Sequence, residues 1–279
     1  MKDDNVQIFM VILDPDIQCI VNELLGRPAR WRALARQGTT NHIYVSEGLS
    51  DACVLRVNTS ASVLGVNRGR EEQVLAAIQG YAWAPVVIAI TKEWLLSPLY
   101  DEASTLDPMS IVGIVAELQR LPEPEDSSSL LIDYHGLWRS YQEKIEQAPL
   151  SQQKRWLPLL HKTQALFNQL PPLDYVWTHH DLHPGNIVAS HQTANLQAVL
   201  LDWEYAGIGS AWVDACGLYQ HWGISADILC KELPAFRGLS ASMVKEGIDA
   251  TQNWLVALEA MWQAVNGLDK ADTISISRY

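Results

Sequence analysis

The stretch from Val176 to Tyr205 constrains the fold of this chain more than any other part of the sequence. The polar segment HHDLHPGN lies near its start and DWE lies near its end, and two apolar runs rich in β-forming residues separate them. These runs predict two strands, over Ile187 to Ala189 and over Leu196 to Leu201, joined by a turn over His191 to Asn195. The sequence therefore predicts a β-hairpin that has polar side chains at both of its ends.

The residues at the two ends of this hairpin suit the binding of phosphate groups and a metal ion. Asn186 and Asp202 would lie side by side, and Mg²⁺ takes oxygen ligands of these types while it keeps positions for substrate phosphates. Asp181, five residues before Asn186, would place a carboxylate in the same loop, where it can accept a proton from a hydroxyl group. Kinases divide their work in this way between a loop Asp, a loop Asn and a later Asp. The alternative is a surface hairpin whose Asp and Asn residues only form turns.

His179, Asp181 and Asn186 match an HxDxxxxN loop, and the DWE sequence, which begins sixteen positions after Asn186, stands where protein kinases have DFG. On these residues the chain resembles the aminoglycoside phosphotransferase and choline kinase superfamily, most closely its choline/ethanolamine and thiamine kinase branches. The resemblance implies an α+β, protein-kinase-like fold of two lobes: a small N-lobe with a five-stranded antiparallel sheet and a larger, mainly helical C-lobe. It also implies that ATP and Mg²⁺ are used, that His179 belongs to the catalytic set, and that the metal is held by Asn186, Asp202 and Glu204.

The composition is that of a folded globular protein. Of the 279 residues, 48% are hydrophobic and 19% are charged, and this length allows two packed lobes. The formal net charge is −12, whereas a nucleic-acid partner requires a basic face. We therefore expect no nucleic-acid partner. The negative charge suits a cationic substrate, although solubility is the simpler explanation of it.

The cysteines and the N-terminus indicate a cytoplasmic protein. No CxxC pair and no Cys/His metal spacing occurs among the four cysteines, which read as free buried thiols, Cys19, Cys53, Cys216 and Cys230. The apolar run from Val6 to Leu13 lacks the basic start and the cleavage site of a signal peptide and is too short to span a bilayer. We expect no membrane partner.

The N-terminal part predicts one helix and then a sheet. Asp14 and Pro15 are suited to the N-cap and first turn of a helix that ends at Leu25, before Gly26. A second helix is predicted from Asn67 to about Gly80. Five β-like runs complete this part, at Trp31–Ala35, His42–Val45, Ala52–Val57, Pro85–Ile90 and Glu93–Leu96. The pattern turns helical after Ser97, so we assign residues 1–97 to a nucleotide-binding lobe and residues 98–279 to a catalytic and substrate-binding lobe.

A glycine-containing turn in the predicted N-lobe can approach nucleotide phosphates. Gly38, Thr39, Thr40 and Asn41 combine small side chains with backbone amides between two strands, and the family has a similar loop at this place. An ordinary hairpin turn is the alternative. In the family the connector after the sheet binds adenine through backbone groups, which assigns Pro98 and Tyr100 to the nucleotide site.

Arg56 occupies the place where protein kinases carry the lysine that pairs with the α- and β-phosphates. A guanidinium can bind two phosphate oxygens at once, so arginine suits this position. An acid of the following helix, Glu71 or Glu72, would hold Arg56 in place. The family's RxxE spacing from Arg68 selects Glu71.

The C-terminal part predicts helices over Pro108–Leu121, Ser128–Gln147 and Ser151–Leu170. Tyr134, Trp138 and Tyr141 recur at helical spacing and read as a core stripe. Barely ten residues separate DWE from the next helix, near Asp214, whereas protein kinases have a long segment there that docks a peptide. We therefore expect a small-molecule acceptor and no protein substrate. Relatives commonly have a proline near Ser210, which is absent here, and an Asp at the start of this helix, so the resemblance implies that Asp214 braces the catalytic loop by accepting its backbone amides.

Aromatic and acidic residues late in the chain suit a cationic acceptor, because cations are attracted to the faces of aromatic rings. The family binds choline against tryptophans near a segment that resembles the one at Trp262, but Glu259 replaces one of those tryptophans. The acceptor is assigned to Asp181, Glu204, Trp222, Glu259 and Trp262. Choline or ethanolamine ranks first as acceptor, then thiamine, then aminoglycosides. A catalytically inactive nucleotide-binding protein is the alternative of another class, and the sequence leaves the oligomeric state open.

Overall fold

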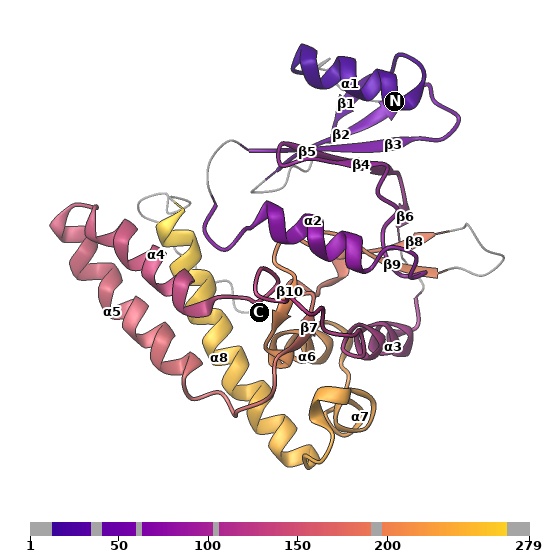
Figure 1. Cartoon of the computed structure of the whole chain (residues 1–279). Helices are drawn as coiled ribbons and strands as arrows, with labels where there is room; N and C mark the ends of the chain where they lie inside the picture. The colour runs from indigo at the N-terminus through magenta and orange to yellow at the C-terminus, as the bar shows by residue number, and fades with distance from the viewer. Residues whose placement is uncertain (1–12, 35–40, 60–62, 103–105, 191–196, 267–279) are drawn as a thin grey trace, which may run out of the picture. The chain divides into compact units, whose positions relative to one another are not determined.

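The computed structural model (Figure 1) describes residues 13–34, 41–59, 63–102, 106–190 and 197–266. The chain divides into two compact units. The first contains Met1–Ser62, Leu75–Ser104 and Val188–Leu201, and the second contains Val63–Val74, Thr105–Ile187 and Asp202–Tyr279. Each unit thus includes a segment that a single boundary after Ser97 would give to the other, and that boundary stays a prediction.

A five-stranded antiparallel sheet forms the centre of the first unit. Its strand order is β1-β2-β3-β5-β4, so β5 lies between β3 and β4. The strands are β1 (Arg30–Ala33), β2 (Asn41–Glu47), β3 (Cys53–Asn58), β4 (Ala89–Ile90) and β5 (Trp94–Pro98). The predicted five-stranded antiparallel sheet is confirmed, although β4 is much shorter than the predicted strand from Pro85 to Ile90.

Helix α1 (Pro15–Leu25) packs on this sheet within the first unit. The Asp14 carboxylate accepts a hydrogen bond from the Asp16 amide at 2.9 Å, and Gly26, with φ 65°, ends the helix in the left-handed conformation. Val21 of α1 packs with Leu55 of β3 in one apolar cluster. The first and last residues of α1 agree with the predicted helix.

The hairpin that the sequence predicted is present. Strand β8 (Ile187–Ser190) lies between β6 (Asp101–Glu102) and β9 (Gln197–Leu200) in a three-stranded sheet. Strand β6 was not predicted; it pairs antiparallel with β8, with Asp101 opposite Ala189. The turn predicted over His191 to Asn195 lies outside the described residues.

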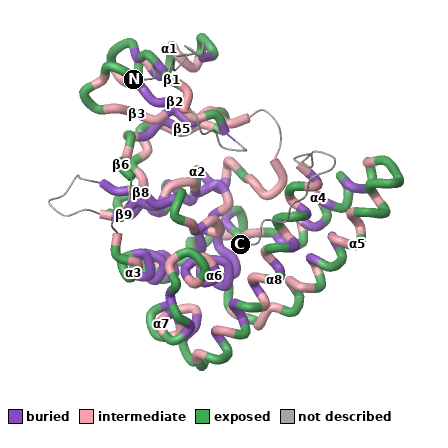
Figure 2. The backbone as a smooth tube through the Cα atoms, turned by 180° about the vertical axis from the view of Figure 1, so that it is seen from behind, coloured by how far each residue is buried: buried purple, intermediate pink, exposed green. Residues whose placement is uncertain are grey.

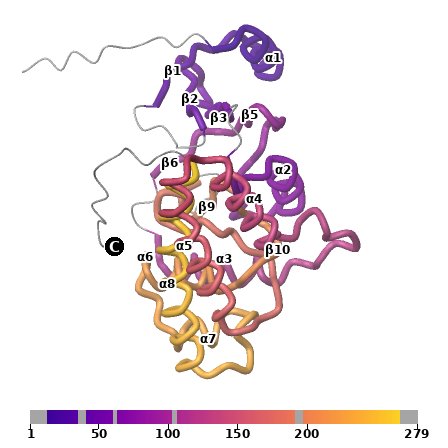
Figure 3. The backbone as a smooth tube through the Cα atoms, turned by 90° about the vertical axis from the view of Figure 1, so that its left-hand side faces the viewer, coloured from indigo at the N-terminus to yellow at the C-terminus, as the bar shows by residue number. Residues whose placement is uncertain are grey.

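Helices make up most of the second unit. Helices α4, α5 and α8 lie side by side (Figures 1 and 3), and their shared core includes the predicted stripe of Tyr134, Trp138 and Tyr141. The helices of this region are α3 (Pro108–Leu118), α4 (Tyr134–Glu146), α5 (Leu150–Phe167), α6 (Ala211–Trp222), α7 (Ala226–Glu232) and α8 (Ala241–Val265), with short 3-10 turns η1 (Pro184–Asn186) and η2 (Pro234–Phe236). Helix α2 (Arg68–Ala77) has its first residues, up to Val74, in this unit and its last in the other.

Two local predictions in this unit were wrong. Helix α4 starts at Tyr134 and not at Ser128, because Asp133 caps it by accepting from the Gly136 amide at 2.7 Å and because Leu131 forms a β-bridge with Ile208. A further pair of strands, β7 (Val176–Thr178) and β10 (Gly207–Gly209), forms a two-stranded antiparallel sheet that the sequence did not predict.

The first half of α6 is buried, from Ala211 to Cys216 (Figure 2). The prediction of four buried thiols holds only in part. Cys53 and Cys216 are buried, but Cys230 is partly exposed and Cys19 is exposed, because it faces solvent on α1. Among the helices of the described residues, none has the length and apolar character needed to cross a membrane.

Candidate active site

The loop after β7 is anchored through its backbone to α6. The amides of His179 and His180 each donate to the Asp214 carboxylate at 2.8 Å, one to Oδ2 and one to Oδ1. Asp214 is fully buried, and its burial raises its pKa to about 6, although the two amide hydrogen bonds oppose the shift. The predicted bracing role of Asp214 is confirmed by these contacts, which fix the backbone immediately before Asp181.

Asp181 is oriented by residues of its own loop. The Asn186 side-chain amide donates to the Asp181 carboxylate Oδ2 at 2.8 Å and to the Asp181 backbone carbonyl at 2.9 Å. His183 Nε2 lies 3.6 Å from the same carboxylate oxygen. Because His183 Nδ1 accepts from the Gly185 amide at 3.0 Å, Nε2 is the nitrogen that carries the proton toward Asp181.

The Asp181 carboxyl group is ionised over the neutral pH range. Burial raises the pKa of Asp181, but the hydrogen bonds from His183 and Asn186 and the electrostatic interactions with His183 and His179 together lower it below its ordinary value. The side chain still exposes 37% of its surface. A charged, oriented and accessible carboxylate is suited to accept a proton.

His179 and the DWE tryptophan pack against each other. The His179 ring is fully buried, its centroid lies 4.6 Å from that of Trp203 in an edge-on arrangement, and its Nδ1 accepts from the Asp181 amide at 3.3 Å. Trp203 is also buried. These contacts fix the place of the His179 ring, and its predicted place in the catalytic set stays a prediction.

Asp202 stands at the far end of the hairpin. It has φ 63°, in the left-handed region that residues other than glycine rarely adopt. Burial raises the pKa of Tyr205, and the negative charges of Glu204, Asp181 and Asp202 raise it further. Acids of both polar segments thus act on Tyr205, and the convergence of Asn186 and Asp202 on one metal ion stays a prediction.

Glu204 and Glu71 share one cation. Arg68 Nη1 lies 2.9 Å from Glu204 Oε2 and 2.9 Å from Glu71 Oε2, and both carboxylate side chains are buried. A terminal guanidinium nitrogen carries two hydrogens, so it can donate one to each acid. The role of Glu204 as a metal ligand and that of Glu71 as the partner of Arg56 stay predictions. Glu72, the alternative partner, is exposed.

A sequence model of the phosphotransferase enzyme family matches residues 92–242, which is more than half of the chain and includes the loop from His179 to Asn186, the DWE segment and α6. This chain belongs to the phosphotransferase enzyme family. No curated protein sequence matches it.

Solved structures of small-molecule kinases are similar to this phosphotransferase over most of its length. The choline kinase LicA from Streptococcus pneumoniae is 17% identical, with 92% of each chain covered and a TM-score of 0.64. A Plasmodium vivax ethanolamine kinase is 14% identical, over 88% of this chain and 78% of that one, with a TM-score of 0.59. A spectinomycin phosphotransferase in complex with ADP and spectinomycin is 12% identical, over 92% and 88%, with a TM-score of 0.58. The predicted protein-kinase-like α+β fold is thus confirmed.

Two residues predicted for the nucleotide site of this phosphotransferase lie on one face of the five-stranded sheet. Arg56 is paired with Ile43 across the strands, and Asn41 lies two residues before Ile43 in β2, so all three point to the same side. Leu55 and Tyr44 point to the other side of the sheet and pack in the apolar cluster that includes Val21 of α1. Arg56 is 7% exposed and Asn41 is 4% exposed. Gly38, Thr39 and Thr40 lie outside the described residues.

The connector after β5 is held by backbone contacts. Pro98 is the last residue of β5 and pairs with Cys53, and the Leu99 amide donates to the Ala52 carbonyl at 2.8 Å. The Tyr100 hydroxyl accepts from the Val86 amide at 2.7 Å, and burial raises its pKa. The Tyr100 hydroxyl keeps its own proton as a donor, and the assignment of Pro98 and Tyr100 to the nucleotide site stays a prediction.

The residues predicted for the acceptor differ in their surroundings. Trp222 is partly buried beside His221, whose ring centroid lies 6.3 Å from that of His183. Trp262 is also partly buried on α8, whereas Glu259 is exposed and accepts from Gln263 at 3.1 Å. The structure thus links Trp222 through two histidines to Asp181, and grouping Trp262 and Glu259 with them stays a prediction.

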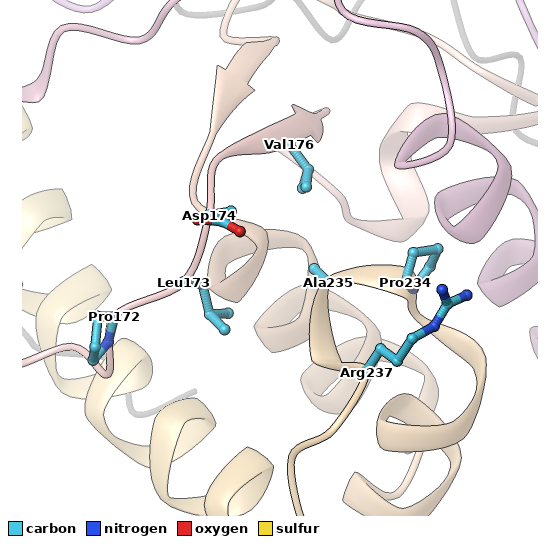
Figure 4. A pocket seen from close by; sticks show the side chains of 7 residues that line it. All are labelled: Pro172, Leu173, Asp174, Val176, Pro234, Ala235 and Arg237. Carbon is cyan, nitrogen blue, oxygen red and sulfur yellow. The ribbon is translucent and has the colours of Figure 1, made fainter.

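A cavity of about 520 Å³ lies elsewhere in the second unit (Figure 4). It is lined by the segment before β7 and by η2, with Asp174 and Arg237 as its charged residues. None of the residues predicted for the active site lines this cavity, so it is not the site described above.

His183 was assigned no role from the sequence, although it lies two residues after Asp181 in the same motif. That spacing was the available signal. From the sequence, Arg68 was named only for its RxxE spacing to Glu71. Its second partner, Glu204, lies 136 positions away, and nothing local marks it.

Proposed function

We propose that this phosphotransferase transfers the γ-phosphoryl group of ATP to the hydroxyl group of a small cationic alcohol. The observation that carries the proposal is the state of Asp181. Its carboxylate is held by Asn186 at 2.8 Å, its pKa is low, and its side chain remains 37% exposed. A group of this kind can orient a hydroxyl and accept its proton.

In the proposed reaction the acceptor oxygen bonds to the γ-phosphorus while the bond from that phosphorus to the bridging oxygen breaks, and ADP leaves with the electron pair. The hydroxyl proton passes to Asp181 and then to solvent. Arg56 compensates phosphate charge, and alignment with charge compensation lowers the barrier. Asn41, Glu71, Pro98 and Tyr100, with the turn of Gly38, Thr39 and Thr40, complete the proposed nucleotide site.

Asn186 and Asp202 are the residues that would hold Mg²⁺. The Asn186 amide nitrogen is used by Asp181, so its oxygen is the atom suited to a cation, and the Asp202 carboxylate supplies a second oxygen ligand. When bound, Mg²⁺ would neutralise charge on the phosphate oxygens. Glu204, whose Oε2 also pairs with Arg68 Nη1 at 2.9 Å, would support the metal ion or its waters.

Among acceptors, choline or ethanolamine ranks first, thiamine second and aminoglycosides third. The net charge of −12 and the acidic and aromatic residues Glu204, Trp222, Glu259 and Trp262 favour a cation. The choline kinase and ethanolamine kinase among the similar structures favour the first rank. We also propose a cytoplasmic location and, because only residues 205–210 separate DWE from α6, no protein acceptor.

An ADP-release assay over choline, ethanolamine, thiamine, an aminoglycoside and a generic peptide library tests the proposal. We expect turnover with at least one of the cationic alcohols and no incorporation of phosphate into peptides. If ATP raises the melting temperature but no member of the panel is phosphorylated, the protein is the catalytically inactive nucleotide-binding alternative. Phosphorylated peptides would contradict the proposed acceptor class.

A further inference from the structure

His180, the residue directly before Asp181, has an unusual backbone conformation. Its φ is 66°, and among the described residues the only other non-glycine residue with positive φ is Asp202. Side chains clash with the backbone in this left-handed region, so something in the surroundings must hold His180 there. The Asp214 carboxylate accepts from the His180 amide, but this hydrogen bond does not hold the His180 ring.

The His180 ring is held by Tyr134, the first residue of α4. The Tyr134 hydroxyl lies 2.9 Å from His180 Nε2, and it accepts a hydrogen bond from the Ser210 amide at 3.0 Å. Since the hydroxyl is an acceptor toward Ser210, its own proton is directed at His180 Nε2. This direction gives the buried hydroxyl proton an acceptor, so we assign the acceptor role to His180 Nε2 and the ring proton to Nδ1.

The surroundings keep this chain of hydrogen bonds rigid and neutral. Burial, together with the electrostatic interactions with Arg70 and His179, lowers the pKa of His180 to about 3. The Tyr134 ring is buried against Phe167 and Trp254, at centroid distances of 4.7 and 6.0 Å. A Cβ on Gly209 would lie 2.9 Å from the Tyr134 hydroxyl and 3.1 Å from His180 Nε2, so glycine alone leaves room for them.

We propose that Tyr134 is a positioning residue: its hydrogen bond holds His180 in the left-handed conformation and thereby sets the direction of the Asp181 carboxylate. The inference rests on the proposed function, in which Asp181 receives the acceptor's proton. Tyr134 then holds the ring of His180, and Asp214 holds its backbone amide. Tyr134 comes from a helix that the sequence marked only as core.

A double-mutant cycle between Tyr134→Phe and His180→Gly tests this. Tyr134→Phe keeps the ring but removes the hydroxyl, and we expect kcat to fall about 10- to 100-fold with KM for ATP unchanged, because misdirection of a reacting group costs rate and not binding. Glycine adopts positive φ freely. If Tyr134 acts through His180, Tyr134→Phe changes kcat less than about twofold in the His180→Gly background. Equal effects in both backgrounds, or no effect in either, would overturn the proposal.

Tyr175→Phe is the matched control. The Tyr175 ring contacts that of Tyr134 edge-on at 5.8 Å, is half exposed, and makes no hydrogen bond to the loop among the described contacts. We expect wild-type kcat from this variant. A loss as large as that of Tyr134→Phe would assign the effect to the ring cluster and refute the hydrogen-bond role.

A measurement on the unmodified protein separates this proposal from the proposed function and remains decisive if Tyr134→Phe does not fold. Nitrogen-15 NMR of labelled histidine should show His180 as the neutral Nδ1–H tautomer throughout the neutral pH range. A His180 ring protonated on Nε2 would overturn the inference, even if the enzyme phosphorylates choline. The expected tautomer with no turnover on any acceptor would instead count against the proposed function alone.

Discussion

At the scale of single residues, Asp181 shows how a carboxylate is kept charged without being closed off. The Asn186 amide and the His183 imidazole both contact it, while more than a third of its side chain faces solvent. Hydrogen bonds to the ionised form of an acid lower its pKa, and here they outweigh the effect of burial. The same arrangement leaves one side of the carboxylate available to a substrate.

Replacing Asp181 with Ala should reduce kcat by about 100-fold or more, because the group that receives the hydroxyl proton is lost. Nucleotide binding should persist, so ATP with Mg²⁺ should still raise the melting temperature. The control is Asp174→Ala, which removes an exposed acid of the separate cavity in Figure 4. Wild-type turnover in Asp181→Ala would remove the assigned base.

Arg68 is the residue on which two buried acids depend. Arg68→Met should destabilise the protein by about 3 kcal/mol, because removing one partner of a buried ion pair leaves its charge uncompensated. Urea unfolding measures this loss. Adding Glu71→Gln should restore part of it, since one of the two carboxylates then needs no cation.

The matched control for Arg68 is Arg139→Met. Arg139 pairs with Asp133 at 3.3 Å, but both side chains are about two-thirds exposed, so the change should stay within about 0.5 kcal/mol. Equal losses in the two variants would show that the Arg68 pair is no stronger than a surface ion pair.

At the scale of secondary-structure elements, α6 is the platform of the catalytic loop. Asp214 accepts the amides of His179 and His180, and Gly217, one turn later, allows the loop backbone at Leu182 to come close. A Cβ on Gly217 would lie 2.5 Å from the Leu182 carbonyl oxygen. Leu182, the residue after Asp181, thus packs directly against α6 at Gly217, which has no side chain.

Gly217→Ala should therefore lower stability by about 1–3 kcal/mol through overpacking, and it should also lower kcat because the loop is pushed away. Thermal unfolding and the ADP-release assay measure the two effects. The control is Gly113→Ala in α3, where a Cβ would meet nothing within 4 Å. That variant should gain about 0.5–1 kcal/mol, since alanine favours a helix over glycine. A neutral Gly217→Ala would mean that the loop yields without cost.

At the scale of the whole molecule, the net charge of −12 would act on the approach of the proposed cationic acceptor. Long-range attraction raises association rates and is screened by salt. We expect kcat/KM for choline to fall severalfold between about 50 mM and about 500 mM NaCl. The uncharged isostere 3,3-dimethylbutanol should show little change. Equal salt dependence for the two alcohols would assign the effect to ATP or to the protein itself.

Several features of this protein were determined by the sequence alone. The helix over Pro15–Leu25, the five-stranded sheet, the hairpin and the core stripe of α4 were predicted correctly, and so was the bracing by Asp214. Apart from the bracing by Asp214, which spans 35 positions and was implied by the resemblance to the family, these features follow from local rules. Caps, turn residues and the periods of strands and helices relate residues that are near in the chain. The motif spacing likewise placed Asp181 and Asn186 in one loop, where they contact each other.

Only the tertiary structure decided which distant residues meet at this loop. Tyr134 bonds His180 across 46 positions and Ser210 across 76, and Arg68 reaches Glu204 across 136. The sheet of β7 and β10 is another such pairing. The physical reason is that a periodic pattern records which face of an element is apolar, whereas a long-range partner depends on how packed elements bring two side chains within hydrogen-bonding distance.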